Sequence, residues 1–158
     1  LVGSEMCIRD RLSSATKYTI RAVLYLATYT DISNKIGVKQ IAEDLEIPQP
    51  FLAKLLQQLS RSKLVSSSKG PSGGFYLSEH NQQNSVWDII KAIDGTEKFD
   101  QCFMGLSTCN DKNPCPVHFI VGPFKEKILY DFKDKSIHEF AGEIKLSDKY
   151  LSLRDFDV

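Results

Sequence analysis

The chain has 158 residues and a formal net charge of zero, and 42% of its residues are hydrophobic and 25% charged, as in ordinary globular proteins. Its length suits one domain with an appendage. No apolar run approaches the roughly 20 residues that span a bilayer, and residues 1–11 lack the apolar segment of a secretory signal. We therefore expect a cytoplasmic protein that has no membrane partner.

Residues 1–11, LVGSEMCIRDR, show no clear periodicity. They precede a segment, from Leu12 onward, that has the pattern of a natural domain start. We interpret residues 1–11 as a non-native leader and leave Cys7 out of the functional argument.

Charge is distributed unevenly behind this leader. Residues 12–77 carry eight Lys and Arg against four Asp and Glu, whereas residues 78–158 carry ten against fourteen. A basic first half and an acidic second half suggest that only the first half approaches a polyanion. A chance difference between two solvated surfaces would give the same split, so charge alone does not decide the question.

The first half has the pattern of a helix-turn-helix. Residues 14–30 predict a largely buried helix, and residues 38–45 predict a short amphipathic one. Pro48 and Pro50 predict a turn between this helix and the next, because proline disfavours helix at the residue before it. Pro50 suits the first turn of a helix that extends to about residue 62. Two short helices around a tight turn are typical of DNA-binding proteins, although such pairs also occur for packing alone.

Two short β-capable runs follow, residues 64–68 and 75–77, around a turn rich in glycine and proline. A hairpin directly after a helix-turn-helix predicts a wing, so we expect residues 12–78 to form a winged helix-turn-helix domain. The turn does not fit the phosphate-binding pattern GxxxxGK[ST]. We expect DNA contacts from the start of the second short helix and from the wing: Gln49, Pro50, Phe51, Lys54, Gln57, Lys69, Ser72 and Gly73.

Residues 79–98 are expected to connect this domain to the second half through a helix at residues 86–93. Ser85 is a plausible N-cap of that helix, and Gly95 marks its end. We interpret Trp87 as a core residue that packs on the winged domain rather than as a binding aromatic.

Residues 99–117 form a polar, turn-rich loop that contains Cys102, Cys109 and Cys115, with His118 just beyond it. The spacing is C-x6-C-x5-C-x2-H. Three cysteines in a cytoplasmic protein do not suit structural disulfides, and free cysteines are usually buried rather than gathered on a polar loop. Metal ligation explains them, with His118 as the fourth ligand. His80 and His138 have no such neighbours in the sequence.

The spacing leaves the identity of the metal open. Structural zinc usually shows CxxC pairs, which this loop lacks, whereas wider spacings suit an iron–sulfur cluster, and thiolates accept either. A nucleophilic cysteine would make the protein an enzyme, but no base accompanies the cysteines, so we do not expect an enzyme. The residues alone favour a cluster over zinc, with inert thiols behind both.

Residues 118–142 are expected to form one long amphipathic helix, with Pro123 at its start or at a kink. A long helix beyond a small winged domain needs a partner, and the simplest is its copy in a second subunit. Folding back onto its own domain fits the periodicity equally well. Residues 143–158 are expected to be a polar tail, to which we assign no role. The fold class is thus mainly α, with a small β-hairpin wing and a long dimerisation helix.

Four stretches together resemble the Rrf2 family of bacterial transcription regulators: LSSATKYTIRAVLYLA, IAEDLEIP leading into FLAKLLQQL, LVSSSKGPSGGFYLS, and the cysteine loop. The resemblance covers almost the whole chain behind the leader. It implies a homodimer joined by the long helix. It also implies that each wing and recognition helix meets one half of a pseudo-palindromic operator in double-stranded DNA.

The subtype that the chain resembles most is the regulator of iron–sulfur cluster assembly, whose members bind a [2Fe-2S] cluster through three cysteines and a histidine. This resemblance implies that Cys102, Cys109, Cys115 and His118 are the ligands, and that the cluster senses cluster status or redox or nitrosative stress. The first cysteine gap is one residue longer than in that subtype. The nitric-oxide-sensing subtype, which resembles a [4Fe-4S] protein, takes an acidic ligand near the chain start. The matching residue is Lys17, which cannot ligate, so the histidine-ligated form is favoured.

Overall fold

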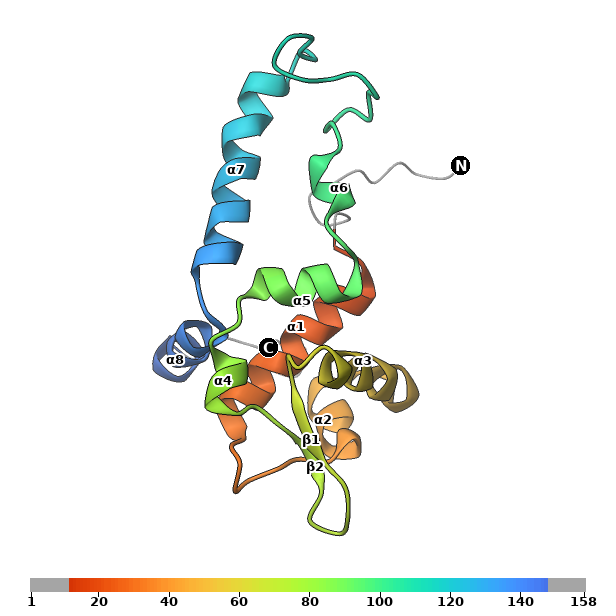
Figure 1. The fold of residues 1–158 in the computed structure, drawn as a ribbon, viewed down its shortest axis with the longest axis vertical. Helices are drawn as coiled ribbons and strands as arrows, with labels where there is room; N and C mark the ends of the chain where they lie inside the picture. Colours follow the sequence, from red (N-terminus) through yellow and green to blue (C-terminus); the bar gives the residue numbers. More distant parts are fainter. Residues whose placement is uncertain (1–11, 148–158) are drawn as a thin grey trace, which may run out of the picture.

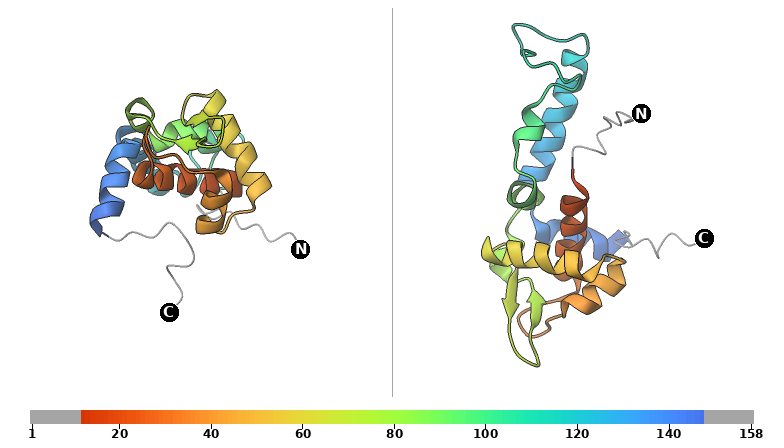
Figure 2. Two further views of the ribbon diagram at one scale, coloured as in Figure 1. Left: turned by 90° about the horizontal axis from the view of Figure 1, so that it is seen from below. Right: turned by 90° about the vertical axis from the view of Figure 1, so that its right-hand side faces the viewer.

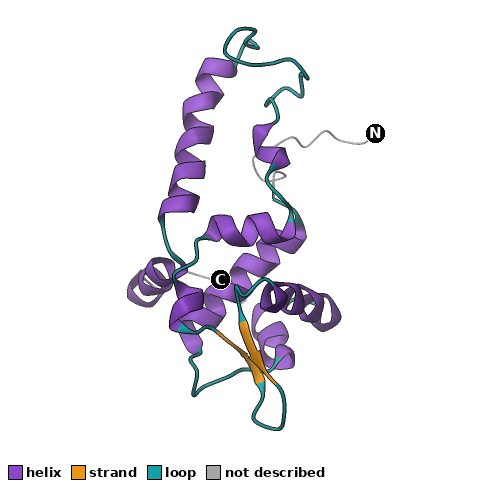
Figure 3. Cartoon of the chain, viewed as in Figure 1, coloured by secondary structure: helices purple, strands orange, loops and turns teal. Residues whose placement is uncertain are grey.

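The structure is a computed structural model that describes residues 12–147. The expected leader with Cys7, and residues 148–158 of the expected tail, lie outside the described residues. The described chain is mainly helical with one two-stranded hairpin, as predicted (Figure 3). Its elements are α1 Ser14–Tyr29, α2 Val38–Leu45, α3 Gln49–Arg61, β1 Ser66–Ser68, β2 Gly74–Tyr76, α4 Glu79–Gln82, α5 Val86–Ile93, α6 Glu97–Asp100, α7 His118–Asp134 and α8 Ile137–Ser147.

The elements are arranged along one long axis. The first five helices, α8 and the hairpin form a body, from which α6, the cysteine loop and α7 project (Figures 1 and 2). The cysteine loop lies at one end of the long axis and the tip of the hairpin at the other (Figure 1).

Helix α1 is the centre of the body. It begins at an N-cap, Ser13, whose hydroxyl oxygen accepts a hydrogen bond from the Thr16 backbone N–H at 3.1 Å. Its apolar face is buried, as the sequence predicts, and this burial supplies most of the stability of a helix of this kind. The main core gathers residues from α1, α2, α3, α5 and α8, including Ala22, Val23, Leu26, Ile41, Leu45, Leu52, Leu56, Leu59, Ile89 and Ile137.

The turn between α2 and α3 confirms the predicted helix-turn-helix. Helix α2 ends at Leu45, and its C-cap Glu46 adopts the left-handed conformation with φ 55° and donates its backbone N–H to carbonyls of the last turn. Pro48 is the N-cap of α3, and Pro50 lies in the first turn, where its missing N–H costs nothing. The Arg21 guanidinium donates to the Leu45 carbonyl at 2.7 Å, which joins the end of α2 to α1.

The hairpin confirms the predicted wing. Strands β1 and β2 are antiparallel, with Ser66 opposite Tyr76 and Ser68 opposite Gly74. The segment before α2 adds a bridge, because Ile36 and Phe75 exchange backbone hydrogen bonds of 3.0 and 2.8 Å. This bridge ties the wing to the entrance of the helix-turn-helix.

The connecting segment, residues 79–98, holds α4, α5 and the beginning of α6 rather than the single helix that we expected. Helix α5 occupies the predicted residues 86–93, and α4 and α6 lie on either side of it. The sequence expectation missed them because four-residue helices are too short to show a helical period. Ser85 caps α5 in a reciprocal arrangement with Asp88. Trp87 packs edge-on against Phe99 of α6 with ring centroids 5.1 Å apart, so it is a packing residue, but it is half-buried in a second cluster rather than buried against the winged domain.

The expected helix over residues 118–142 is two helices in the structure. Helix α7 ends at Asp134, and α8 begins at Ile137. The break has a local cause: Ser136 and Glu139 form a reciprocal cap, in which the Ser136 backbone N–H donates to the Glu139 carboxylate at 2.8 Å and the Glu139 N–H donates to the Ser136 hydroxyl at 3.2 Å. Ile137 is fully buried in the main core. Residues 143–147 therefore belong to a packed helix rather than to the polar tail.

Among residues 12–147, no helix is both long enough and apolar enough to span a membrane.

Candidate DNA-binding surface and metal centre

Helix α3 has one buried and one exposed face. Its four leucines are buried, and the opposite face exposes four of the residues expected at DNA: Gln49, Pro50, Lys54 and Gln57. A polar face on the second helix of a helix-turn-helix is the arrangement that reads base edges in a major groove.

Two other residues of α3, Phe51 and Gln58, contact neighbouring helices. Phe51, expected at DNA, is 39% exposed, and its ring meets Tyr18 of α1 edge-on with centroids 6.0 Å apart. One part of the Phe51 side chain therefore packs on α1, and the rest faces solvent. Gln58 points toward α5, because its amide donates to the Ala92 carbonyl at 2.7 Å. This bond joins α3 to α5, from which the chain continues toward the cysteine loop.

The hairpin turn carries the three wing residues expected at DNA. Lys69 and Ser72 are exposed, whereas Gly73 is half-buried. Gly73 closes the turn by donating its N–H to the Gly70 carbonyl at 2.9 Å. A Cβ atom at Gly73 would lie 2.4 Å from the Ser68 carbonyl oxygen, so only glycine fits this turn. Gly73 therefore shapes the wing, while Lys69 and Ser72 present polar groups at its tip.

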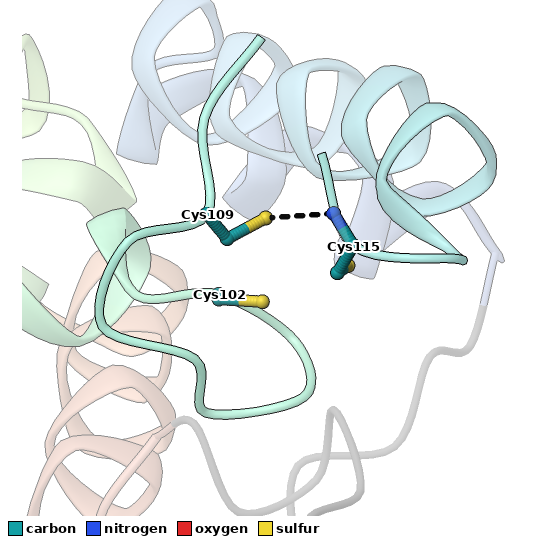
Figure 4. A group of neighbouring side chains, drawn as sticks. All are labelled: Cys102, Cys109 and Cys115. Atoms are coloured by element: carbon teal, nitrogen blue, oxygen red, sulfur yellow. Dashed lines mark hydrogen bonds between the residues drawn. The ribbon is translucent and has the colours of Figure 1, made fainter. Parts of the chain in front are cut away.

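The three cysteines of the loop converge on one place. The Sγ atoms of Cys102, Cys109 and Cys115 all lie within 4.8 Å of one another, although the residues are up to thirteen apart in sequence. Figure 4 shows the three side chains meeting between the loop and the chain that leads into α7. All three are free thiols. The Cys115 backbone N–H donates to Cys109 Sγ at 3.4 Å, which ties the Cys109 sulfur to the backbone of Cys115 (Figure 4).

The thiols influence each other's acidity. Burial raises the pKa of Cys102, but hydrogen bonds from the backbone of Leu106 and Met104 and from the other two thiols outweigh it and lower that pKa to about 7. The pKa of Cys109 is raised: the Cys115 N–H lowers it, but burial and the two neighbouring thiols act more strongly together. The loop thus favours one thiolate over the others. Metal ligands are thiolates, so the lowered pKa of Cys102 is compatible with metal ligation.

His118 is the first residue of α7 and lies beside the thiols, so the expectation that no base accompanies the cysteines is wrong at Cys109. Its Nδ1 is 3.1 Å from Cys109 Sγ, and its Nε2 is 2.9 Å from a carboxylate oxygen of Asp111. The four expected ligands line a cavity of about 200 Å³, together with Asp111 and residues of α6 and α7. The structure thus brings all four into one site, with the three thiols as the tightest group.

Asp111 was missed by the sequence argument, although a signal was present. It lies in a tight turn whose ends, Asn110 and Asn113, exchange backbone hydrogen bonds of 3.2 and 3.0 Å. The Asn110 side chain also accepts from the Lys112 and Asn113 N–H groups, as in an Asx turn. The sequence Asn-Asp-Lys-Asn between two cysteines predicts such a turn, but it does not show that the carboxylate turns toward His118.

A second hollow was not anticipated. An apolar groove of about 260 Å³ follows α7 beside the cysteine site. Its wall includes Phe99, Phe103, Phe124, Ile128 and Phe132. The exposed side of α7 is also apolar, since Phe119, Ile120 and Tyr130 are each more than 60% exposed.

A helix-turn-helix followed by a hairpin defines a winged-helix DNA-binding protein, and the thiol cavity beyond it is a candidate metal centre. A family model described as an iron-dependent transcriptional regulator, Rrf2, matches residues 12–150. The chain belongs to the Rrf2 family of transcription regulators, as the sequence motifs indicated.

Individual relatives agree with this assignment. An HTH-type transcriptional regulator of Aquifex aeolicus is 34% identical over 141 residues, which cover 88% of this chain and 94% of the relative. The HTH-type transcriptional regulator IscR of Cronobacter sakazakii is 30% identical over 138 residues, or 87% of this chain and 84% of that protein.

Solved structures share the fold. The global cysteine regulator CymR of B. subtilis matches with a TM-score of 0.66 at 18% identity, over 83% of this chain and 95% of that one. T. potens IscR matches with a TM-score of 0.66 at 20% identity, over 88% and 91%. These two likenesses support the winged-helix fold of this chain.

Proposed function

We propose that the protein is a DNA-binding regulator that senses cluster status or redox or nitrosative stress through an iron–sulfur cluster, and that it acts in the cytoplasm. The observation that carries this proposal is the convergence of three free thiols, beside an imidazole, on a loop at the far end of the molecule from the wing. Structural thiols that only pack would lie in the core, but two of these three are only half-buried. The relatives named IscR are consistent with the proposal.

The donor set fits a cluster. Cys102, Cys109 and Cys115 would supply thiolates, and His118 would supply an imidazole nitrogen, a mixed set that cluster-binding proteins use. We propose a [2Fe-2S] cluster for this set. When bound, the cluster supplies redox chemistry and sensitivity to agents that attack iron or sulfide. Cys102, Cys109 and Cys115 of the loop and His118 at the start of α7 would hold it.

The chain offers a physical link from the site to the DNA-binding body. Cys102 follows α6, whose Phe99 is buried in a second core with Val86 and Ile90 of α5. The carbonyl of Ala92, near the end of α5, accepts the hydrogen bond from Gln58 of α3. We propose that ligation of Cys102 fixes α6 and, through this contact series, the position of the recognition helix.

We further propose that the protein acts as a homodimer that binds a pseudo-palindromic operator. The exposed apolar side of α7 and the adjoining groove supply a surface that a second copy would cover. Sedimentation should therefore show a dimer, and Phe124→Lys should give a monomer. Ile32→Lys, which changes an apolar residue 69% exposed in the loop after α1, should leave the dimer intact.

The cluster is tested by anaerobic purification, a visible absorption spectrum, and analysis of iron, acid-labile sulfide and zinc. The proposal predicts a brown protein with iron and sulfide in equal amounts, and loss of the colour in Cys102→Ser, Cys109→Ser and Cys115→Ser. A colourless protein with stoichiometric zinc would instead identify a zinc-stabilised regulator without a sensing cluster.

A further inference from the structure

The turn between the second and third cysteines brings a carboxylate to the outer side of the candidate ligand His118. The Asp111 Oδ1 lies 2.9 Å from His118 Nε2, while the opposite nitrogen, Nδ1, lies 3.1 Å from Cys109 Sγ. Both nitrogens of the ring are therefore engaged, one outward and one toward the thiols. The Phe119 ring meets the imidazole edge-on, with ring centroids 5.0 Å apart.

These contacts assign the protons of the ring. An ionised carboxylate only accepts hydrogen bonds, so Nε2 must carry the proton and donate to Asp111. A neutral imidazole has one protonated nitrogen, so Nδ1 keeps its lone pair and accepts from the Cys109 thiol. That lone pair is the group a metal requires, and it already faces the thiol cavity.

The geometry points to Asp111 as a positioning residue that holds His118 with Nδ1 toward the cluster, an inference that rests on the function proposed above. The hydrogen bonds between Asn110 and Asn113 hold the backbone on both sides of Asp111 in a turn, which sets where the carboxylate lies. A carboxylate that accepts from the outer nitrogen of a ligating histidine orients the ring and makes it a more basic ligand. The Asp111 side chain is 92% exposed and lines the cavity at its rim, and it is not one of the three residues whose sulfur atoms converge there.

The same protein contains an internal reference. The His138 Nδ1 lies 2.9 Å from the Gln82 side-chain oxygen, which can only accept, so His138 carries its proton on Nδ1. His118 and His138 should therefore show opposite tautomers in one spectrum.

The first arm of the test uses the full chain without metal, labelled with ¹⁵N-histidine, at about pH 8, where a free imidazole is neutral. His118 should show the Nε2–H tautomer and His138 the Nδ1–H tautomer. Asp111→Ala should move the His118 signals toward the mixture of free imidazole, and Asp111→Asn, which keeps an acceptor oxygen, should restore the wild-type pattern. His118 signals that are the same in wild type and Asp111→Ala would overturn the inference.

The second arm uses anaerobically reconstituted protein. Asp111→Ala should weaken cluster retention by about 10–100-fold and raise the reduction potential, because a negative charge next to a ligand is lost. Asp111→Asn should keep most of the retention. Asp100→Asn removes the same charge from the wall of the same cavity, and it should leave retention and the His118 tautomer unchanged. Equal loss of cluster in Asp100→Asn and Asp111→Ala would show a general charge effect and overturn the positioning role.

The two arms fail separately. A wild-type protein that takes up no cluster would overturn the proposed function, and the tautomer of His118 in the metal-free chain would still decide whether Asp111 orients the ring.

Discussion

Gln49 and Lys69 are both exposed on the DNA-binding half of the molecule, but we expect them to contribute differently. Gln49 is the first residue of α3, where an amide can pair with adenine through two hydrogen bonds. Gln49→Ala should therefore weaken binding to preferred sites by about 1–3 kcal/mol at one base pair, and weaken binding to random DNA less. Lys69 lies at the wing tip and should meet phosphate. Lys69→Ala should weaken binding to all sequences alike and lower the salt slope by about 1.

Fluorescence anisotropy titrations with specific and random duplexes, at several salt concentrations, separate the two roles. If Gln49→Ala lowered affinity for every sequence equally, α3 would not be the reading helix.

Gly73 is the wing residue for which the structure adds a role in shaping the turn to the expected DNA contact. Because a Cβ atom would lie 2.4 Å from the Ser68 carbonyl oxygen, Gly73→Ala should destabilise the protein by about 1–3 kcal/mol and weaken DNA binding through a distorted wing. Gly142→Ala is the matched control. Gly142 lies in α8 with nothing near its missing Cβ, so alanine should raise the free energy of unfolding by about 0.5–1 kcal/mol. Urea unfolding of both variants tests the pair.

At the residue scale, the sequence predicted the identities in the site better than their contacts. The spacing of Cys102, Cys109 and Cys115 is unusual enough to indicate ligation, and the structure brings their sulfur atoms together. The role of Asp111 depends on which way one turn faces. That direction is set by tertiary packing, and no periodic pattern in the sequence records it.

Among the elements, α8 is the part of the expected long helix that folds back onto its own domain, an alternative that the sequence left open beside dimerisation. Ile137 is fully buried in the main core, so Ile137→Ala should lower the free energy of unfolding by about 2–5 kcal/mol. Leu146 lies in the same helix and is 90% exposed, and Leu146→Ala should change stability by less than about 0.5 kcal/mol. Equal, small effects in urea unfolding would show that α8 does not pack on the body.

The junction of α1 and α5 gives the protein a predictable dependence on pH. Burial raises the pKa of Asp94, but hydrogen bonds from the Ser13 hydroxyl and backbone N–H outweigh it and lower that pKa. A carboxyl whose pKa is lower in the folded state stabilises the fold above its unfolded pKa of about 4, and the contribution is lost as the pH falls through the folded value.

Asp94→Asn should therefore lower the free energy of unfolding by about 1–2 kcal/mol at neutral pH. The value is kept this small because the hydrogen-bonded carboxylate is partly solvated. The difference from wild type should narrow below about pH 4. Asp131→Asn, which removes a carboxylate paired with Lys127 on the surface of α7, should have little effect at either pH. Urea unfolding at several pH values measures this difference. The account would be contradicted if the unfolding free energies of wild type and Asp94→Asn differed by the same amount at neutral and at acid pH.

The elements differ in how far the sequence predicted them. Helices α1, α2, α3 and α5 and the hairpin follow from hydrophobic periodicity and from prolines and glycines at their ends. The end of α7 does not, because apolar residues continue through the break. The signal there is the capping pair Ser136 and Glu139, which the periodicity argument passed over.

At the scale of the whole molecule, the thiol site and the wing lie at opposite ends of the long axis (Figure 1). In the proposed function, a cluster at one end would therefore influence DNA binding at the other end through the body between them. The second core, in which Phe99 packs with residues of α5 and α7, lies between the two ends. In a dimer bound to two half-sites about one helical turn apart, small changes in the relation of the subunits would alter DNA affinity strongly.

The measurement that tests this account most directly is the DNA affinity of one preparation in two states, with its cluster and after anaerobic removal of the cluster, across a library of promoter fragments at fixed salt concentration. The account predicts that the two states differ in affinity or in preferred sites, and that Cys102→Ser behaves like the cluster-free state. Identical affinities and site preferences in both states would contradict it.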